Sequence, residues 1–269
     1  MQISKISAAY FSPTGTTQKI VDAIARGMEI ANKKTIDFTL PQGNPEQLPA
    51  FNDELVILGA PVYGGRLPGE AVKRLSKLKG KNTPAVVVVL YGNREFEDAL
   101  LELKDLAVNQ GFIPVAGAAF IGEHSYSSPE TPIAVGRPDA DDIAKAEDFG
   151  KEIIKKLDSI KELKDENSVK VPGNTPYKDI NFSSNDCAKS DMDICTQCST
   201  CVTVCPTNAI ADDDNYTTNP ELCILCAACV KACPENARYI DSERVKKASK
   251  WLTENFKTPK QPEIFIQIK

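Results

Sequence analysis

The sequence predicts a doubly wound α/β domain followed by a small, cysteine-dense α+β domain. Residues 1–161 alternate short apolar runs with helical patterns, whereas residues 162–186 are polar and contain Pro and Gly. All nine cysteines fall between positions 187 and 233. A chain of 269 residues and 29.3 kDa has room for one medium domain and one small domain.

The first domain is expected to contain five parallel strands joined by helical crossovers. Two of the apolar runs, "ELVILGA" and "PAVVVVL", are almost continuous in apolar residues, as in strands that are covered on both faces. Ligands of such sheets bind beyond the carboxyl ends of the strands. The five runs are 3–10, 34–40, 54–60, 84–90 and 112–122. The helix-like stretches lie near 15–31, 69–79, 94–110 and 140–160.

The rest of the chain divides into three parts. Residues 162–186 are interpreted as a linker, and residues 187–241 as the cysteine domain, which is too short to build a large core and is expected to be held together by inorganic centres. Residues 242–269 are expected to form a C-terminal helix and tail. The helix, near 242–256, either packs on a domain or binds a partner through the stripe Val245, Ala248, Leu252 and Phe256.

Charge and hydropathy exclude several classes of function. The formal net charge of −5 and the single histidine argue against nucleic acid or anionic membranes as main partners. No run approaches the ~20 apolar residues of a membrane span. The N-terminus has no charged leader followed by an apolar segment. We therefore expect a cytoplasmic protein.

The cysteine domain contains an internal repeat. "CTQCSTCVTVCPTNAI" (195–210) is matched by "CILCAACVKACPENAR" (223–238), and each copy reads C-x2-C-x2-C-x3-C-P. This is the bacterial [4Fe–4S] run, in which the fourth cysteine ligates the other cluster. Zinc also uses C-x2-C pairs, but it needs two such pairs per site rather than three evenly spaced cysteines and a fourth.

The repeat predicts the ligands of two [4Fe–4S] clusters. The proline after each run disfavours the α conformation at the fourth cysteine and is expected to hold it extended. Cys187 lies outside both runs and is either a free thiol or a ligand. The first predicted set is Cys195, Cys198, Cys201 and Cys233, and the second is Cys205, Cys223, Cys226 and Cys229.

A second candidate site begins at "SPTGTT" (12–17), after the first predicted strand. The loop is neither a P-loop nor a dinucleotide fingerprint, since both motifs are absent. Its hydroxyls and amides form either a phosphate cradle at a helix N-terminus or an ordinary helix cap. Two later loops, 59–70 and 90–98, place Tyr63 and Tyr91 beside glycines, where a flat ring could stack.

With "SPTGTT", "YGNREFEDAL", "GEHSYS" and the doubled cysteine motif, nearly the whole chain resembles the flavodoxin–ferredoxin fusion ("ferrodoxin") family. The resemblance implies a flavodoxin-like domain with FMN, whose phosphate is held without basic side chains, and a 2[4Fe–4S] ferredoxin-like domain. It implies electron transfer between clusters and FMN, with redox protein partners (ferredoxin-like or a low-potential oxidoreductase). Because paired [4Fe–4S] clusters lack a protective scaffold here, we also expect an anaerobic or microaerobic cell. The implied FMN residues are Ser12, Pro13, Thr14, Gly15, Thr16, Thr17, Pro61, Val62, Tyr63, Gly64, Gly65, Arg66, Tyr91, Gly92, Asn93 and Arg94.

One departure from flavodoxins concerns charge. Arg66 and Arg94 stand where flavodoxins usually carry acidic residues, and they lie either near the flavin or in solvent. His124 is either structural or able to donate a proton. These residues favour an alternative function, an FMN-dependent reductase of a quinone, disulfide or activated alkene. Short loops without a substrate lid argue against that alternative.

Overall fold

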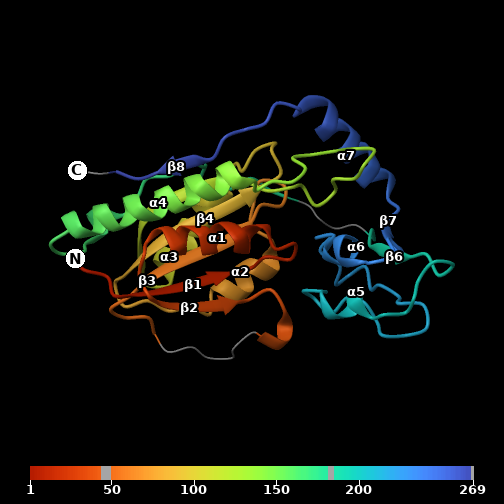
Figure 1. Ribbon diagram of the computed structural model, residues 1–269, viewed down its shortest axis with the longest axis horizontal. Coiled ribbons are helices and arrows are strands. Elements are labelled where there is room, and N and C mark those ends of the chain that lie inside the picture. The colour runs from red at the N-terminus through yellow and green to blue at the C-terminus, as the bar shows by residue number, and fades with distance from the viewer. Residues whose placement is uncertain (44–49, 181–184, 268–269) are drawn as a thin grey trace.

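The computed structural model describes residues 1–43, 50–180 and 185–267, so four residues of the predicted linker and the last two of the tail lie outside the described residues. The larger domain is a sheet covered by helices, and the cysteine domain lies beyond one end of that sheet (Figure 1). The larger domain contains β1 (Lys5–Tyr10), α1 (Thr16–Gly27), β2 (Asn32–Asp37), the 3₁₀ turn η1 (Pro41–Gly43), β3 (Leu55–Pro61), α2 (Gly69–Leu75), β4 (Thr83–Tyr91), α3 (Ala99–Asn109), β5 (Phe112–Ile121) and α4 (Ala140–Ser159).

The first five strands are parallel and follow the order β2-β1-β3-β4-β5. This is the flavodoxin-like order, so the predicted fold class is confirmed. β4 is buried at every position, as expected of a central strand covered on both faces, whereas β2 is mostly exposed at the edge. One face of the sheet packs against α1 and α4, and the other packs against α2 and α3.

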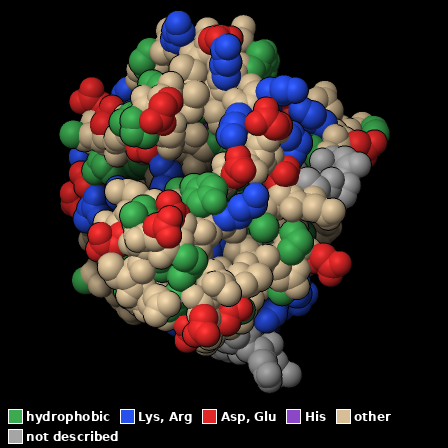
Figure 2. All heavy atoms as spheres, turned by 90° about the vertical axis from the view of Figure 1, so that its right-hand side faces the viewer, with side chains coloured by type: hydrophobic (Ala, Val, Ile, Leu, Met, Phe, Trp, Pro, Cys, Tyr) green, Lys and Arg blue, Asp and Glu red, His purple; other side chains and the backbone are tan. Residues whose placement is uncertain are grey.

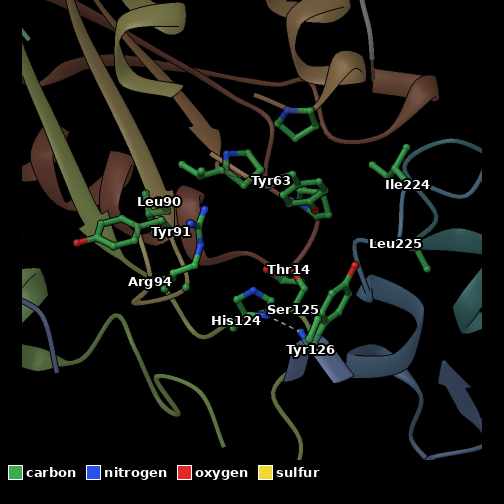
Figure 3. A pocket seen from close by; sticks show the side chains of 18 of the residues that line it. Thr14, Tyr63, Leu90, Tyr91, Arg94, His124, Ser125, Tyr126, Ile224 and Leu225 are labelled. Atoms are coloured by element: carbon green, nitrogen blue, oxygen red, sulfur yellow. Dashed lines mark hydrogen bonds between the residues drawn. The ribbon is translucent and has the colours of Figure 1, made fainter. Parts of the chain in front are cut away.

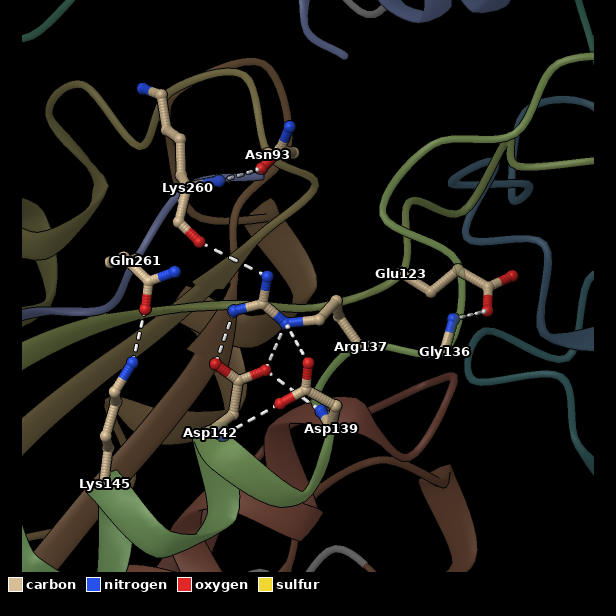
Figure 4. Close-up of polar contacts among 9 residues, drawn as sticks. All are labelled: Asn93, Glu123, Gly136, Arg137, Asp139, Asp142, Lys145, Lys260 and Gln261. Carbon is tan, nitrogen blue, oxygen red and sulfur yellow. Dashed lines mark hydrogen bonds and ion pairs between the residues drawn. The ribbon is translucent and has the colours of Figure 1, made fainter. Parts of the chain in front are cut away.

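A sixth strand, β8 (Glu263–Phe265), was not expected from the sequence. It pairs antiparallel with β5 at Gly117–Ala119 and covers the edge of the sheet. The segment that leads to β8 is held by side chains of the larger domain: Asn93 bonds its backbone, Arg137 donates to Lys260 O, and Lys145 bonds Gln261 (Figure 4). We call residues 256–265 the C-terminal strap.

The described part of the predicted linker packs on the larger domain. Val169 is buried, and its N–H donates to Pro114 O at 2.7 Å. The N–H groups of Asn174 and Lys178 both donate to the buried carboxylate of Asp98, at 2.8 and 2.7 Å. A short 3₁₀ turn, η2 (Asp165–Asn167), precedes this stretch. The segment is therefore anchored by specific hydrogen bonds instead of running freely through solvent.

The cysteine domain is built on the sequence repeat. It contains β6 (Ala188–Ser190), α5 (Thr200–Thr203), α6 (Ala228–Ala232) and β7 (Arg238–Ile240), and β6 pairs antiparallel with β7. Its small core contains several of the cysteines themselves. The helix α7 (Glu243–Asn255) follows and confirms the helix expected near 242–256. In the described ranges no helix is long and apolar enough to cross a membrane.

Candidate cofactor site

A cavity of about 960 Å³ lies at the carboxyl ends of β1, β3, β4 and β5, at the upper end of the range for ligand sites. It faces α7 and the cysteine domain (Figure 3), and the space-filling view shows a hollow on this side of the molecule (Figure 2). All three loops named in the sequence analysis reach it. The predicted residues that line it are Ser12, Pro13, Thr14, Thr16, Thr17, Pro61, Val62, Tyr63, Gly64, Tyr91, Gly92 and Arg94.

Four predicted residues do not line this cavity. Gly15 caps α1 with a φ of 78°, and Gly65 packs against Glu97. Arg66 is drawn away from the cavity by a two-pronged ion pair with Glu102, with N–O distances of 2.8 and 2.9 Å. Asn93 is only 3% exposed and turns its amide to the C-terminal strap, where it bonds Phe256 O, Thr258 O and Lys260 N.

The loop 12–17 combines a fixed backbone with a buried hydroxyl that has no partner among the described residues. Ser12 is used structurally, because its N–H donates to Thr39 Oγ1 at 2.9 Å and its Oγ accepts from Gln18 N at 3.1 Å. The left-handed Gly15 turns the chain into α1, whose first amides face the cavity end of the sheet. Thr17 Oγ1 is buried and has no hydrogen-bond partner among the described residues. A buried donor of this kind fits an anion at the helix N-terminus.

The two loop tyrosines differ in orientation. Figure 3 shows the Tyr91 ring directed away from the other labelled side chains, and it packs against Phe96 with ring centres 5.5 Å apart. Tyr63 lies on the side of Ile224, and its hydroxyl interacts with Ser125. Burial, together with the nearby Cys226 and Tyr126, raises the pKa of Tyr63. Tyr63 is therefore the tyrosine placed to contact a flat ring in the cavity.

His124 and Arg94 also line the cavity, but neither offers a free charge. Arg94 Nη1 is paired with Glu97 Oε1 at 2.7 Å. His124 packs so closely on Gly92 that a Cβ there would lie 2.2 Å from its ring. Its Nδ1 accepts the Tyr126 N–H at 3.0 Å. Burial, followed by Lys231 and Arg94, lowers the pKa of His124 to about 4, so the ring is neutral near pH 7.

The eight repeat cysteines surround two small cavities in the crossed pattern. One cavity is lined by Cys195, Cys198, Cys201 and Cys233, and the other by Cys205, Cys223, Cys226 and Cys229. In the ranges 1–43, 50–180 and 185–267, no three His, Cys, Asp or Glu side chains are arranged to hold a single metal ion. Each set is spread around a space instead.

Backbone conformation repeats with the sequence in both cysteine loops. Gln197 and Ser199 of the first loop, like Leu225 and Ala227 of the second, have positive φ between 53° and 58°. Such conformations cost about 1 kcal/mol or more in ordinary residues, so the tight wrapping of each loop is a built feature. After the turn, Cys233 is extended (φ −70°, ψ 116°), as the following proline predicts.

Arg238 joins the two halves of the cysteine domain. It is buried and donates to Ser190 Oγ, Tyr216 O, Ala188 O and Thr218 Oγ1 at 2.6 to 3.2 Å. It lines the cavity of the first cysteine set, and its charge opposes the rise that burial causes in the pKa of Cys229, which is about 11. Arg238 was not among the predicted site residues, although it is the only arginine in residues 187–241, which was a usable signal.

The second cysteine set adjoins the large cavity. Cys223, Ile224 and Leu225 line both the cavity of that set and the cavity between the flavodoxin-like loops (Figure 3). In the first set, Cys198 is exposed, whereas Cys226 in the second is buried. The two sets thus differ in position: one lies next to the large cavity and the other nearer to solvent.

One part of the chain matches a known protein family. Residues 172–238 match the family of 4Fe-4S dicluster domains, a match that begins within the predicted linker. No curated protein matches the chain. Among solved structures, the chain is similar to a flavodoxin from the domain Archaea (15% identity, 57% of this chain and 99% of that chain, TM-score 0.37). It is also similar to flavodoxin 2 from Bacillus cereus (20%, 56% and 99%, TM-score 0.39) and to rubredoxin oxygen:oxidoreductase from Desulfovibrio gigas (13%, 58% and 36%, TM-score 0.41).

The strand order and the family match together define the class of protein. The chain joins a flavodoxin-like domain to a 4Fe-4S dicluster domain, as the sequence resemblance predicts. This combination indicates an electron-transfer protein.

Proposed function

We propose that the protein passes electrons between two [4Fe–4S] clusters and FMN, and so links one-electron and two-electron redox partners. The observation that carries the proposal is the shared wall of the large cavity. Residues 223–225 belong to a cysteine loop and at the same time line the cavity formed by the flavodoxin-like loops. A cluster held by that loop would lie next to a flavin held by those loops.

FMN would be held without a basic side chain at its phosphate. The amides of the loop 12–17 and the hydroxyl of Thr17 are the donors that fit the phosphate, and the dipole of α1 favours its charge. Tyr63 and the backbone of 61–64 and 91–92 would contact the ring. When bound, FMN supplies storage of one or two electrons. The four predicted residues that do not line the cavity would shape the site without contacting the flavin. They are Gly15, Gly65, Arg66 and Asn93.

The two crossed cysteine sets would be the cluster ligands. Four thiols spread around a space suit a cube-shaped cluster, whose ligands attach at separate corners. Backbone amides already point at two of the sulfurs, since Ala209 N bonds Cys205 Sγ and Ala237 N bonds Cys233 Sγ, both at 3.2 Å. Cys187 lines neither of the two small cavities, although its neighbour Ala188 lines the cavity of the second set. We therefore assign Cys187 to no cluster.

Position suggests the order of transfer. The set with the exposed Cys198 would receive electrons from a ferredoxin-like or low-potential protein partner, and the set beside the large cavity would pass them to FMN. Acidic and basic side chains interleave on this side of the molecule (Figure 2). We assign residues 1–161 to the flavin domain, 187–241 to the cluster domain and 242–269 to the helix and strap, with 162–186 as an anchored connection.

A second candidate function is reduction of a small molecule at the flavin. It is favoured by one observation, which is that α7 forms a wall of the large cavity through Arg244, Ala248, Trp251 and Leu252. The flavodoxin-like loops are short and carry no lid insertion, which argues against an enzyme. A covering element is present, but it comes from the C-terminal helix and not from a loop of the flavodoxin-like domain.

The test is an anaerobic preparation in which flavin, iron and sulfide are quantified on the same sample. We expect about one FMN, eight iron and eight sulfide per chain. In Cys226→Ala the protein should lose about half of its iron, and its flavin should be reduced more slowly. In Cys198→Ala the protein should lose iron but keep its flavin. Cys187→Ala should change neither the iron nor the flavin content. Full iron content without flavin would refute the proposal.

A further inference from the structure

The large cavity extends past the three flavodoxin-like loops. Beyond these loops it has two further walls, one formed by a face of α7 and the other by the loop 122–126, which follows β5. The α7 residues on this wall follow one another at helical spacing, so a continuous face of the helix is turned to the cavity. They are Arg244, Ala248, Trp251 and Leu252. We call the space between this face and residues 122–126 the α7 compartment.

Trp251 gives the compartment an aromatic wall. It is the only tryptophan in the chain, and 50% of its surface is exposed although it is a large aromatic side chain. Its ring meets Phe256 edge-on at 5.1 Å. Ile224 and Leu225 add aliphatic surface from the cysteine loop. An accessible aromatic ring beside aliphatic side chains in a concave site is suited to a flat, apolar ligand.

The positively charged side chains of the cavity wall are paired within the protein. Arg244 is paired with Asp186 at 3.0 Å, and both Arg94 and Lys178 are paired with Glu97 at 2.7 and 2.6 Å. An anionic ligand would therefore have to compete with existing ion pairs, whereas an uncharged one would not.

The hydrogen-bond donors that remain are neutral. Tyr126 contributes a hydroxyl to the wall, whereas the hydroxyl of Ser125 interacts with Tyr63. His124 uses Nδ1 to accept the Tyr126 N–H, so its neutral ring carries the proton on Nε2. These groups suit a ligand that accepts hydrogen bonds through oxygen.

We propose that the α7 compartment binds a planar, uncharged molecule with a conjugated carbonyl group, the class to which quinones belong. That this molecule would lie beside a bound flavin rests on the proposed function. A quinone takes up two electrons and two protons and becomes a hydroquinone, so it would be a two-electron partner for a chain that receives single electrons from a ferredoxin-type protein.

The test measures binding and not turnover. Equilibrium dialysis of the oxidised, cofactor-loaded full chain would use 2,3-dimethyl-1,4-naphthoquinone, whose substituted ring does not add to thiols. We expect saturable binding of about one molecule per chain with the flavin retained. Ala248→Phe should weaken binding at least tenfold by filling the compartment, and Trp251→Ala should also weaken it. Lys247→Phe adds the same side chain at an exposed position of α7 outside the cavity wall and should change nothing.

Three results would overturn the inference: uptake without saturation, equal binding by Ala248→Phe and the unmodified chain, or release of one flavin for each quinone bound. The flavin and iron content of the same samples reports separately on the proposed function. A chain that carries FMN and clusters but fails to bind the quinone would therefore refute the compartment alone.

Discussion

The unpartnered hydroxyl of Thr17 provides a test of the phosphate loop at the scale of one residue. Thr17→Val keeps the shape of the side chain and removes the donor. We expect FMN affinity to fall roughly ten- to a hundredfold, since a hydrogen bond to a charged group contributes about 1.5–3 kcal/mol. Fluorescence titration of the apoprotein with FMN measures the change.

A matched control exists in α7. Thr253 Oγ1 is also buried and unpartnered among the described residues, but Thr253 lies outside the cavity wall. Thr253→Val should leave FMN affinity unchanged. Equal losses in both variants would show that the hydroxyl of Thr17 has no special role.

Arg238 is a buried cation in the cluster domain, and its positive charge should stabilise the reduced state of a nearby cluster more than the oxidised state. Reduction adds negative charge to a cluster, so a nearby cation stabilises the reduced form. We expect Arg238→Gln to lower cluster potentials on the order of 100 mV, from a charge pair in a medium of effective dielectric near 20. Potentiometric titration followed by electron paramagnetic resonance measures this.

Arg238→Lys separates charge from structure in the same experiment. It keeps the cation but loses most of the four hydrogen bonds. Potentials close to the unmodified protein in Arg238→Lys, with lower ones in Arg238→Gln, would support the electrostatic role. Equal potentials in all three proteins would contradict it.

His124 gives the protein one titration that can be isolated, because it is the only histidine. Its pKa in the folded state is about 4, below the ordinary value of 6.5, so the unfolded chain binds more protons between these values. Stability should therefore be complete above pH 6.5 and fall as the pH drops toward 4, by up to about 3 kcal/mol.

Denaturant unfolding of the protein at pH 7.5 and pH 5 measures this contribution as a difference between variants. His124→Asn can still accept the Tyr126 N–H but does not titrate. We expect the unmodified protein to lose more stability than His124→Asn between the two pH values. The same loss in both would assign the pH dependence to other groups.

At the scale of elements, Asn93 connects the flavin loops to the C-terminal strap. Asn93→Gly keeps the positive φ of 64° accessible while it removes three hydrogen bonds to the strap. We expect faster amide exchange in residues 258–265 and a loss of about 1–3 kcal/mol in stability. Hydrogen–deuterium exchange detects the first effect and denaturant unfolding the second.

Asn82→Gly is the matched control, since Asn82 also has positive φ (52°) but is exposed in a turn. It should leave both measurements close to those of the unmodified protein. If strap exchange is unchanged in Asn93→Gly, the strap is held by β8 and by Arg137 without help from Asn93.

The strands and helices with strong periodicity could be predicted from sequence, and the weakly patterned elements could not. β4 is a run of apolar residues, and α4 begins with a capping box between Asp139 and Asp142, so both have local signals. β8 spans three residues and has no period of its own. It exists because β5 would otherwise present an open edge.

The same distinction applies to the candidate site. The cysteine sets follow from spacing within the repeat, because each loop is a local structure. The positions of Arg66 and Asn93 could not be predicted, since their partners, Glu102 and the strap, are distant in sequence. The contribution of α7 to the cavity depends on how the two domains dock, which no local pattern encodes.

At the scale of the whole molecule, two polar contacts among the described residues join the domains. Lys231 of α6 pairs with Glu123 of the loop after β5 at 2.6 Å, and the buried Arg74 of α2 donates to Pro206 O. The C-terminal strap adds a third connection. Together they favour a docked cluster domain over one that swings on a linker.

Docking predicts that electron transfer from clusters to flavin needs no domain motion. After rapid reduction of the clusters, the rate of flavin reduction should stay constant when sucrose doubles the viscosity. Lys231→Glu should slow transfer by placing two carboxylates together, and adding Glu123→Lys should restore it. A rate that halves with doubled viscosity would indicate a swinging domain.

The strap also determines where the ends of the chain lie. The N-terminal amine bonds the carbonyl of Leu157 at the end of α4, and β8 returns the chain along the sheet, so Met1 and the last described residues lie on the side opposite the cysteine domain (Figure 1). A protein fused to either end, or an electrode linked there, would leave the exposed Cys198 unobstructed. The molecule could thus be attached on the side away from the cysteine domain, and the face that we propose to accept electrons would stay available.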